Sequence, residues 1–411
     1  MERTDSRGIL PAGRGSVAVV GGGPAGLVTA IALARRGIRS TVFERDQHPN
    51  TGPRINPDKA YMVDITDHGL RALRYIEATP YFDARMLRFK GIQQHGRVVD
   101  RWSKPGWTGS RSDILRALLD LICDHYAESV DLCFEAGVSH VDVHTGTVTR
   151  ESPEGTTTGR FDLVVGADGG GSVVRRAMQQ QVCGFVVRTT SIPTYVTMIE
   201  LSRVGDRLDK HYLQALSVRH FNVAGAVNGD DGPQSARWFC CVGSKEALAW
   251  RSVDDAREYF RRVCPAILDL ASDDDIAAFV QRPACHVGRT ASCSQLHAGR
   301  AVLLGDAAAA FPPIGQGVNA AMESAAVLDR CIGEAAGDLT AGAACYDAEW
   351  KPEADAVSWI AQRVLLEEPI DMLRSCVTTL LGGSAVGPAL SPELPYSEVR
   401  RRAERLVPAW T

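Results

Sequence analysis

Three apolar runs, each followed by a glycine-containing turn and then by a helical pattern, constrain the fold of this chain more than any other feature. They lie at residues 17–20, 161–165 and 301–304. Apolar runs of this length that alternate with helices are typical of parallel strands in a doubly wound α/β sheet. Such sheets bind ligands beyond the carboxyl ends of their strands, so we expect the three turns to converge on one extended ligand.

The first turn, GGGPAG at residues 21–26, has the spacing of a dinucleotide-binding fingerprint. In that spacing Gly21 forms the tight turn, Gly23 lets the backbone approach a pyrophosphate, and Gly26 lets helix and strand pack closely. The next predicted strand ends at Glu44, where a carboxylate can accept hydrogen bonds from a ribose. The predicted contacts of a dinucleotide in this part of the chain are Gly21, Gly23, Ala25, Gly26, Glu44 and Arg45.

The third turn combines a carboxylate with the start of a long helix. Asp306 follows the strand, prolines occupy the turn at 311–313, and an Ala-rich helix is predicted from about Gly317. Asp306 can hold a sugar hydroxyl, and the unpaired amides at the helix start, with the positive end of the helix dipole, can hold an anion. In the middle turn Asp168 likewise precedes a helix. All three turns therefore offer groups that suit the sugars and phosphates of one cofactor.

Together these blocks resemble the FAD-dependent aromatic hydroxylases typified by para-hydroxybenzoate hydroxylase, and among them most nearly the kynurenine 3-monooxygenase-like enzymes. The resemblance covers residues 15 to about 350. It rests on the first turn with Glu44, on Ser110-Arg111 before a helix predicted over 113–126, on Asp168-Gly169-x-x-Ser172-x-x-Arg175, and on the block 305–319. The stretch 63–73 looks like the kynurenine branch.

This resemblance implies bound FAD, NADPH or NADH as reductant, and O₂ as oxidant. It implies oxygen transfer from a flavin C4a-hydroperoxide to an aromatic or polycyclic small molecule, in aromatic or secondary metabolism. It requires no general acid or base, and the spacing reveals none. The resemblance places Pro313, Gly315 and Gln316 at the flavin, and adds Arg111, Asp168, Arg175, Asp306, Gly315, Gly317, Val318 and Asn319 as cofactor contacts.

Simpler roles exist for several of these residues. Arg111 could pair with Asp113 or lie in solvent, and Arg175 could be a surface charge of its helix. Asp306 could act as an N-cap without any ligand. We favour the cofactor roles because the complete blocks match.

Departures from the family pattern bear on the substrate. Ala309 and Ser324 replace the usual histidine and aspartate, and FAD binding is expected to survive both changes. Ile92 stands where the kynurenine enzymes carry an arginine that grips the substrate carboxylate. Because a buried carboxylate without a partner is costly, we expect a larger or less polar aromatic substrate than kynurenine. The residues that could line its pocket are Ile92, Tyr195, His211, Tyr212, Arg219 and Phe239, of which strand alternation lets about half face inward.

We expect two interleaved domains and a C-terminal helical region. Residues 1–75, 106–180 and 285–350 are assigned to a discontinuous, Rossmann-like FAD-binding domain, and 76–105 with 181–284 to a mostly antiparallel substrate-binding sheet. Strands are predicted in that sheet at 194–201, 211–218, 221–227 and 237–242, with a turn at 228–233. The helical region covers 351–411.

Composition agrees with this class of protein. The chain has 411 residues, 45% hydrophobic and 23% charged, and its net charge of −4 gives no reason to expect nucleic acid. No signal peptide or membrane-spanning run is seen, so we expect a cytoplasmic monomer or homodimer without membrane contact. The eleven cysteines are irregularly spaced and lack a C-x-x-C motif, so we predict neither disulfides nor a metal.

Other activities of the same fold remain alternatives. Epoxidation and Baeyer–Villiger oxidation begin from the same flavin chemistry. A flavin halogenase normally carries a W-x-W-x-I-P element, which Trp102 and Trp107 do not match. A flavin reductase and a ligand-binding flavoprotein without turnover are the remaining alternatives.

Overall fold

The computed structural model describes residues 15–52, 62–217, 220–229, 232–364 and 394–406. Its first layer is a six-stranded sheet with the order β18-β19-β10-β1-β2-β6, parallel except for β18. These strands are β1 (Val17–Val20), β2 (Ser40–Phe43), β6 (Val130–Cys133), β10 (Leu163–Gly166), β18 (His297–Ala298) and β19 (Ala301–Leu303). Because β1, β10 and β19 are neighbours, the three predicted turns leave the same edge of one sheet, as the sequence predicts.

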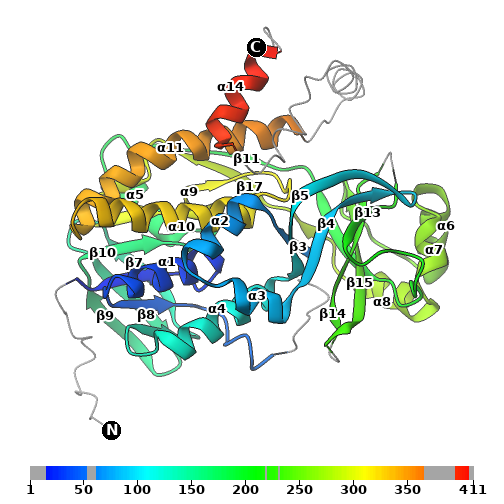
Figure 1. The fold of residues 1–411 in the computed structure, drawn as a ribbon, viewed down its shortest axis with the longest axis horizontal. Coiled ribbons are helices and arrows are strands. Elements are labelled where there is room, and N and C mark those ends of the chain that lie inside the picture. Colours follow the sequence, from blue (N-terminus) through cyan, green and yellow to red (C-terminus); the bar gives the residue numbers. More distant parts are fainter. Residues whose placement is uncertain (1–14, 53–61, 218–219, 230–231, 365–393, 407–411) are drawn as a thin grey trace.

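Long helices cover this sheet (Figure 1). They are α1 (Pro24–Arg35), α4 (Arg111–His125), α5 (Val173–Gln181), α10 (Gly317–Glu334) and α11 (Leu339–Val364). Helix α1 is buried almost throughout, from Ala25 to Ala34, which accounts for its uniformly small and apolar sequence. Helix α4 begins with a capping box, in which the side chain of Ser110 accepts from the Asp113 amide and the Asp113 carboxylate accepts from the Ser110 amide.

The second large sheet has eight strands in the order β16-β12-β15-β14-β13-β4-β5-β3. The strands are β3 (Met62–Ile65), β4 (Leu87–Gln94), β5 (Arg97–Ser110), β12 (Tyr195–Glu200), β13 (Tyr212–Ala215), β14 (Asn222–Gly229), β15 (Gly232–Ser244) and β16 (Cys285–His286). Only the β4–β13 pair is parallel, which confirms the mostly antiparallel character of this sheet. The turn predicted at 228–233 is shorter, because pairing continues to Gly229 and Gly232.

Three short helices that the sequence analysis did not predict pack on one face of this sheet. They are α6 (Val253–Val263), α7 (Ala266–Leu270) and α8 (Asp273–Gln281). Phe260 and Phe279 of these helices share a buried apolar cluster with the sheet residues Ile199, Ala224 and Trp238. In Figure 1 the three helices lie at the end of the molecule far from α1 and α10, so the opposite face of the sheet turns inward. That inner face carries a small apolar cluster of Met198, Val227 and Phe239.

Smaller elements complete the molecule. Two three-stranded sheets are formed by β7 (Gly137–Asp142), β8 (Thr147–Ser152) and β9 (Gly155–Arg160), and by β11 (Val187–Ser191), β17 (Arg289–Cys293) and β20 (Ala309–Ala310). The remaining helices are α2 (Asp67–Tyr75), α3 (Thr79–Arg85), α9 (Gly305–Ala308) and α14 (Tyr396–Leu406).

The predicted domain boundaries stay predictions, and one strand crosses them. Strand β5 runs through the boundary placed between 105 and 106, and β3, assigned to the FAD-binding domain, pairs with it in the large sheet. In the C-terminal region the described parts are helical, namely the end of α11 and α14, whereas 365–393 and 407–411 lie outside the described residues. Within the described parts of the chain, no helix has the length and apolar character needed to cross a membrane.

Candidate active site

The first turn is built so tightly that only glycine fits at two of its positions. Gly21 has φ +105°, and a Cβ there would lie 2.4 Å from the carbonyl oxygen of Ala167, in the turn after β10. A Cβ on Gly26 would lie 2.0 Å from the carbonyl oxygen of Gly21. The Gly22 amide donates to the Glu44 carboxylate at 2.7 Å. The turns after β1 and β10 therefore touch, and Glu44 is fixed beside them at the end of β2.

Two positive features meet at the start of α1. Gly23 occupies the N-cap position without a side-chain cap, so the amides of the first helical turn, including that of Ala25, have no acceptor within the helix. A Cβ on Gly23 would lie 3.7 Å from Nη2 of Arg111, which places the exposed Arg111 guanidinium beside the positive end of the helix dipole. Among the described residues Arg111 forms no ion pair, whereas Asp113 is engaged by Ser110. This arrangement suits an anion such as a pyrophosphate.

Arg175 joins the other two turns. It is buried, so it is not the surface charge considered above. Its Nη1 donates to the carbonyl oxygens of Asp306 at 3.1 Å and Ala307 at 2.9 Å, and its Nη2 donates to that of Gly170. Arg175 thus fastens the turn after β10 to the turn after β19, and its predicted contact with the cofactor remains a prediction.

The two aspartates of these turns differ in their surroundings. Asp168 accepts hydrogen bonds from Ser172 Oγ at 2.5 Å and from the Val173 amide at 2.6 Å, and so holds the start of α5. The Asp306 side chain is accessible to solvent, and the protein atoms packed around its carboxyl group raise its pKa by partial desolvation. Arg111 and Arg175 partly oppose that shift. A solvent-accessible carboxyl group at the end of a strand can accept from the hydroxyls of a polar ligand.

The loop before α10 divides into exposed and buried positions. Pro313 and Gly315 are exposed, and Gly315 has φ +78°, a conformation that favours glycine. Gly317 and Val318, at the start of α10, are half-buried. Their amides belong to a helix start without a side-chain cap. These positions can present backbone donors to a ligand.

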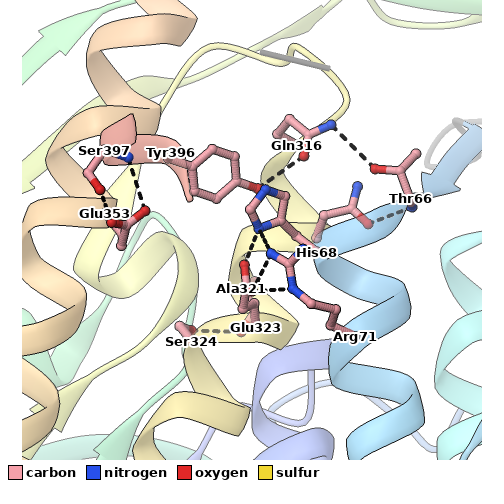
Figure 2. Close-up of polar contacts among 11 residues, drawn as sticks. Thr66, His68, Arg71, Gln316, Ala321, Glu323, Ser324, Glu353, Tyr396 and Ser397 are labelled. Atoms are coloured by element: carbon pink, nitrogen blue, oxygen red, sulfur yellow. Dashed lines mark hydrogen bonds and ion pairs between the residues drawn. The ribbon is translucent and has the colours of Figure 1, made fainter. Parts of the chain in front are cut away.

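Asn319 and Gln316, by contrast, are buried and make their hydrogen bonds inside the protein; Figure 2 shows those of Gln316. Nδ2 of Asn319 donates to the carbonyl oxygens of Asp64 and Gly315, each at 2.9 Å, and its Oδ1 accepts from the Thr66 amide at 2.8 Å. Nε2 of Gln316 donates to Thr66 Oγ1 at 3.4 Å. Both residues therefore fasten the loop to β3, and direct contact with a cofactor is not needed to explain them.

A buried network that the sequence analysis missed supports the same loop. The Tyr396 hydroxyl, from α14, donates to Oε1 of Gln316 at 3.0 Å, and its ring stacks on His68 with centroids 3.9 Å apart (Figure 2). His68 contacts Glu323, which also pairs with Arg71 at 2.6 Å. The only sequence signal was the pair of polar residues one helical turn apart in α2. Their partners lie more than 250 residues away along the chain.

Both departures from the family pattern fit locally. Ala309 is buried in β20, where it pairs with Ser292. The Ser324 hydroxyl donates to the Ala321 carbonyl at 2.7 Å and accepts from the Gly305 amide at 3.4 Å, so it links α10 to the turn after β19.

An open recess lies beside the end of β2. It has a volume of about 390 Å³ and is lined by Arg45, Glu135, Gly137, Val138, Ser139, Glu151, Ser152 and Pro153. The Ala136 amide donates to the Glu44 carbonyl oxygen at 2.8 Å, and the recess is lined by residues on either side of this bond, Arg45, Glu135 and Gly137.

Strand register separates the predicted substrate residues. Phe239 lies in the inner apolar cluster, and Ile92 is opposite Leu213, on the inner face as well. Tyr195 shares the alternation of Ile199 and therefore faces α6–α8. Tyr212 also faces α6–α8, because Gln214, two residues on, is opposite Ala224 of that cluster.

The other two substrate candidates are not placed on the inner face. His211 precedes β13, and its Nδ1 contacts the Arg88 carbonyl oxygen at 2.8 Å. Arg219 lies outside the described residues.

The comparisons with known proteins agree with this geometry. A family model described as FAD binding domain matches residues 14–357. Kynurenine 3-monooxygenase of Salinispora arenicola is 30% identical over 376 residues, which are 84% of this chain and 78% of that protein. Violacein synthase of Chromobacterium violaceum is 25% identical over 359 residues, 84% of this chain and 83% of that protein. The structure of p-nitrophenol 4-monooxygenase from Pseudomonas putida shares the fold, with a TM-score of 0.68, 17% identity, and coverage of 95% of this chain and 97% of that one.

The glycine turns, the carboxylates at the strand ends and the exposed helix starts are thus those of a chain whose relatives are flavin enzymes. The chain belongs to the FAD binding domain family, and it is an FAD-dependent monooxygenase that uses NAD(P)H and O₂.

Proposed function

We propose that this monooxygenase hydroxylates an aromatic or polycyclic small molecule whose ring system is bound by apolar side chains rather than through a carboxylate. The observation that carries the proposal is the inner face of the large sheet. Ile92 and Phe239 lie there, beside the apolar cluster that includes Met198 and Val227. An apolar surface of this kind favours an apolar ring. Arg237 lies 5.3 Å from the centroid of the Phe239 ring, but its guanidinium is already paired with Glu200, so we expect it not to bind a substrate carboxylate.

The same structure supports specific roles toward FAD, which when bound accepts hydride from the nicotinamide and activates O₂. The start of α1 and the Arg111 guanidinium would hold the pyrophosphate. Glu44 would accept from the ribose of the adenosine, with the adjoining recess for the adenine. Asp306 would accept from the ribityl hydroxyls.

The flavin ring would lie against Pro313 and Gly315, which are exposed in the loop. The amides of Gly317 and Val318, at the positive end of the α10 dipole, would stabilise negative charge on the ring. Gln316, Asn319 and Arg175 would keep the loop and turns in place through the hydrogen bonds described above.

The test is NADPH and NADH oxidation by the purified holoenzyme under air, with phenols, indoles, polycyclic phenols and aromatic acids. We expect one phenolic or polycyclic compound to accelerate oxidation and to gain one ¹⁸O atom from ¹⁸O₂. A product without ¹⁸O, or acceleration by aromatic acids alone, would contradict the proposal. Light scattering on the same preparation tests the expected monomer or homodimer.

A further inference from the structure

Two cysteines and one glutamate lie together between α10 and α11, away from the site described above. Cys331 belongs to α10, whereas Cys345 and Glu349 belong to α11, one helical turn apart. Among the residues that the structure describes, they are the one group of three potential metal ligands whose ligand atoms all lie within 4.8 Å of one another. The sequence analysis missed this group because its members are irregularly spaced and lie on two helices.

The close packing of the two helices brings these side chains together (Figure 1). Helix α10 ends at Glu334 and α11 begins at Leu339, so the two form a helical hairpin. A Cβ on Gly342 would lie 2.6 Å from Cα of Ile332, so the two backbones approach closely beside Cys331. The position of the cluster is therefore fixed by the backbone, and not only by flexible side chains.

The spacing of the ligand atoms is close to that around a tetrahedral zinc ion. With metal–sulfur bonds of about 2.3 Å and metal–oxygen bonds of about 2.1 Å, a tetrahedral site separates two sulfurs by about 3.8 Å and a sulfur from an oxygen by about 3.6 Å. The Cys331 thiol donates to Oε2 of Glu349 at 3.7 Å. The thiols of Cys331 and Cys345 also contact each other. Small side-chain rotations are enough to place an ion among the three.

Arg330 holds the carboxylate in the orientation that a ligand needs. Its Nη2 pairs with Oε1 of Glu349, while Oε2 accepts from Cys331. Carboxylates that ligate metals usually have such an outer hydrogen bond. The guanidinium also adjusts the charge, because two thiolates, one carboxylate and one arginine sum to −2. A divalent cation neutralises that charge.

The three ligands differ in exposure. Cys331 is buried, Cys345 is half-buried and Glu349 is exposed, so the cluster has a dry inner side and a side open to solvent. Burial raises the pKa of the Cys331 thiol above its usual range, and the thiol is protonated without an ion. A zinc ion displaces thiol protons to solvent when it binds. Water from the open side can supply the fourth ligand.

We propose that Cys331, Cys345 and Glu349 bind a thiophilic divalent cation of the Zn²⁺ type, which cross-links α10 to α11. Two sulfurs and one carboxylate oxygen favour Zn²⁺ over Mg²⁺ and Ca²⁺, which prefer oxygen ligands. Gly317 begins α10 and Cys331 follows fourteen residues later, about 21 Å along the helix at 1.5 Å per residue. The ion is therefore too distant to contact the loop that would hold the flavin, and its role is structural.

The experiment titrates the FAD-loaded protein with Zn²⁺ after reduction by a phosphine, treatment with a chelator and dialysis. Calorimetry should show one equivalent of Zn²⁺ bound by the wild type that Cys331→Ser, Cys345→Ser and Glu349→Gln each bind about tenfold or more weakly. Loss of an outer partner of a ligand already weakens binding by about tenfold, so loss of a ligand should do at least as much. Zn²⁺ should also raise the unfolding temperature of the wild type more than that of the three variants.

Two variants serve as matched controls. Cys123→Ser changes an exposed cysteine of α4, and Glu334→Gln removes the other carboxylate that pairs with Arg330, at 2.8 Å. Both should bind Zn²⁺ as the wild type does. With Cd²⁺ in place of Zn²⁺, ultraviolet absorption from metal–thiolate bonds should appear in the wild type and both controls, and should fall in the two cysteine variants of the cluster.

A reduced wild type that binds no Zn²⁺ at about 10 µM would overturn the inference. Unchanged binding in Glu349→Gln or in either cysteine variant of the cluster would also overturn it. Retained FAD absorbance shows that a variant is folded. If a cysteine variant loses FAD, Glu349→Gln decides, because Glu349 is exposed. The assay uses neither substrate nor NAD(P)H, so its result is independent of the proposed function.

Discussion

The two large sheets of this molecule build their binding sites in different ways. The six-stranded sheet offers mainly backbone groups, with Gly21 and Gly26 so closely packed that no side chain fits. The eight-stranded sheet offers side chains, among them Met198, Val227 and Phe239 of its apolar inner face. A site made of backbone tolerates little sequence change and recurs across a family, whereas a site made of side chains can change one residue at a time. The first therefore reports the cofactor and the second the substrate.

The strongest way to break this comparison is to add one methyl group to the backbone site. Gly26→Ala would place a Cβ 2.0 Å from the Gly21 carbonyl oxygen, in a turn that is fixed on both sides. We expect loss of FAD from the purified protein and destabilisation of several kcal/mol, since the backbone cannot shift without opening the sheet edge. Flavin absorbance and thermal unfolding measure both effects.

The matched control is Gly52→Ala, where nothing lies within 4 Å of an added Cβ and the φ angle is ordinary. It should keep FAD and change stability by less than about 1 kcal/mol. A Gly26→Ala protein that retains FAD normally would show that the turn is not the cofactor site.

The eight-stranded sheet also holds a buried acid, Asp64, whose effect on stability should depend on pH. The pKa of Asp64 is raised from 3.8 to about 6 in the folded protein, so its ionisation costs stability. Relative to the ionised form, the protonated carboxyl group stabilises the folded protein. This stabilisation is fully present below pH 3.8 and is lost as the pH rises through about 6. Asp64→Asn, which does not ionise there, should gain stability over the wild type between these values, by about 3 kcal/mol at most at pH 8.

Thermal unfolding of both proteins from pH 4.5 to 8 measures this difference, with Asp131→Asn, an exposed strand residue, as control. A difference between wild type and Asp64→Asn that is the same at both ends of the range would show that the carboxyl group is not perturbed.

The smallest expected effect concerns Gln316, which hydrogen-bonds to Tyr396 of α14 on one side and to Thr66 after β3 on the other. Tyr396→Phe keeps the ring stacked on His68 but removes the donor to Gln316, which leaves a buried amide oxygen unpaired. We expect the free energy of unfolding to fall by about 1–2 kcal/mol and the affinity for FAD to decrease. Tyr81→Phe, whose hydroxyl donates to Asp124 at the surface, should cost less than about 0.5 kcal/mol.

Thermal unfolding and FAD titration of the apoprotein measure both tyrosine variants. Equal stability of Tyr396→Phe and the wild type would mean that the hydrogen bond from Tyr396 does not help to hold Gln316 in place.

The sequence predicts the backbone site well because its signals are local. Gly21, Gly26 and Glu44 lie within one strand–helix–strand unit, and the capping box at Ser110 is readable from adjacent residues. The prediction that the three turns converge is confirmed by the order β19-β10-β1, which the structure establishes.

The side-chain site was not predictable in the same way. The inward or outward direction of Tyr195 and Tyr212 depends on register, which the sequence alone leaves open. Asp64 lies in a stretch noted only for its resemblance, and its burial depends on its pairing with Thr108 and on the approach of β14, both distant in the chain.

Strand β5 has a further consequence. It begins in the substrate sheet at Arg97 and ends at Ser110, whose side chain caps the helix that starts with Arg111. One strand therefore connects the sheet that would bind the aromatic ring to the guanidinium that would bind the phosphates. If binding of the aromatic ring shifts β5, it must change the affinity for FAD, and FAD must change the affinity for the ring by the same factor.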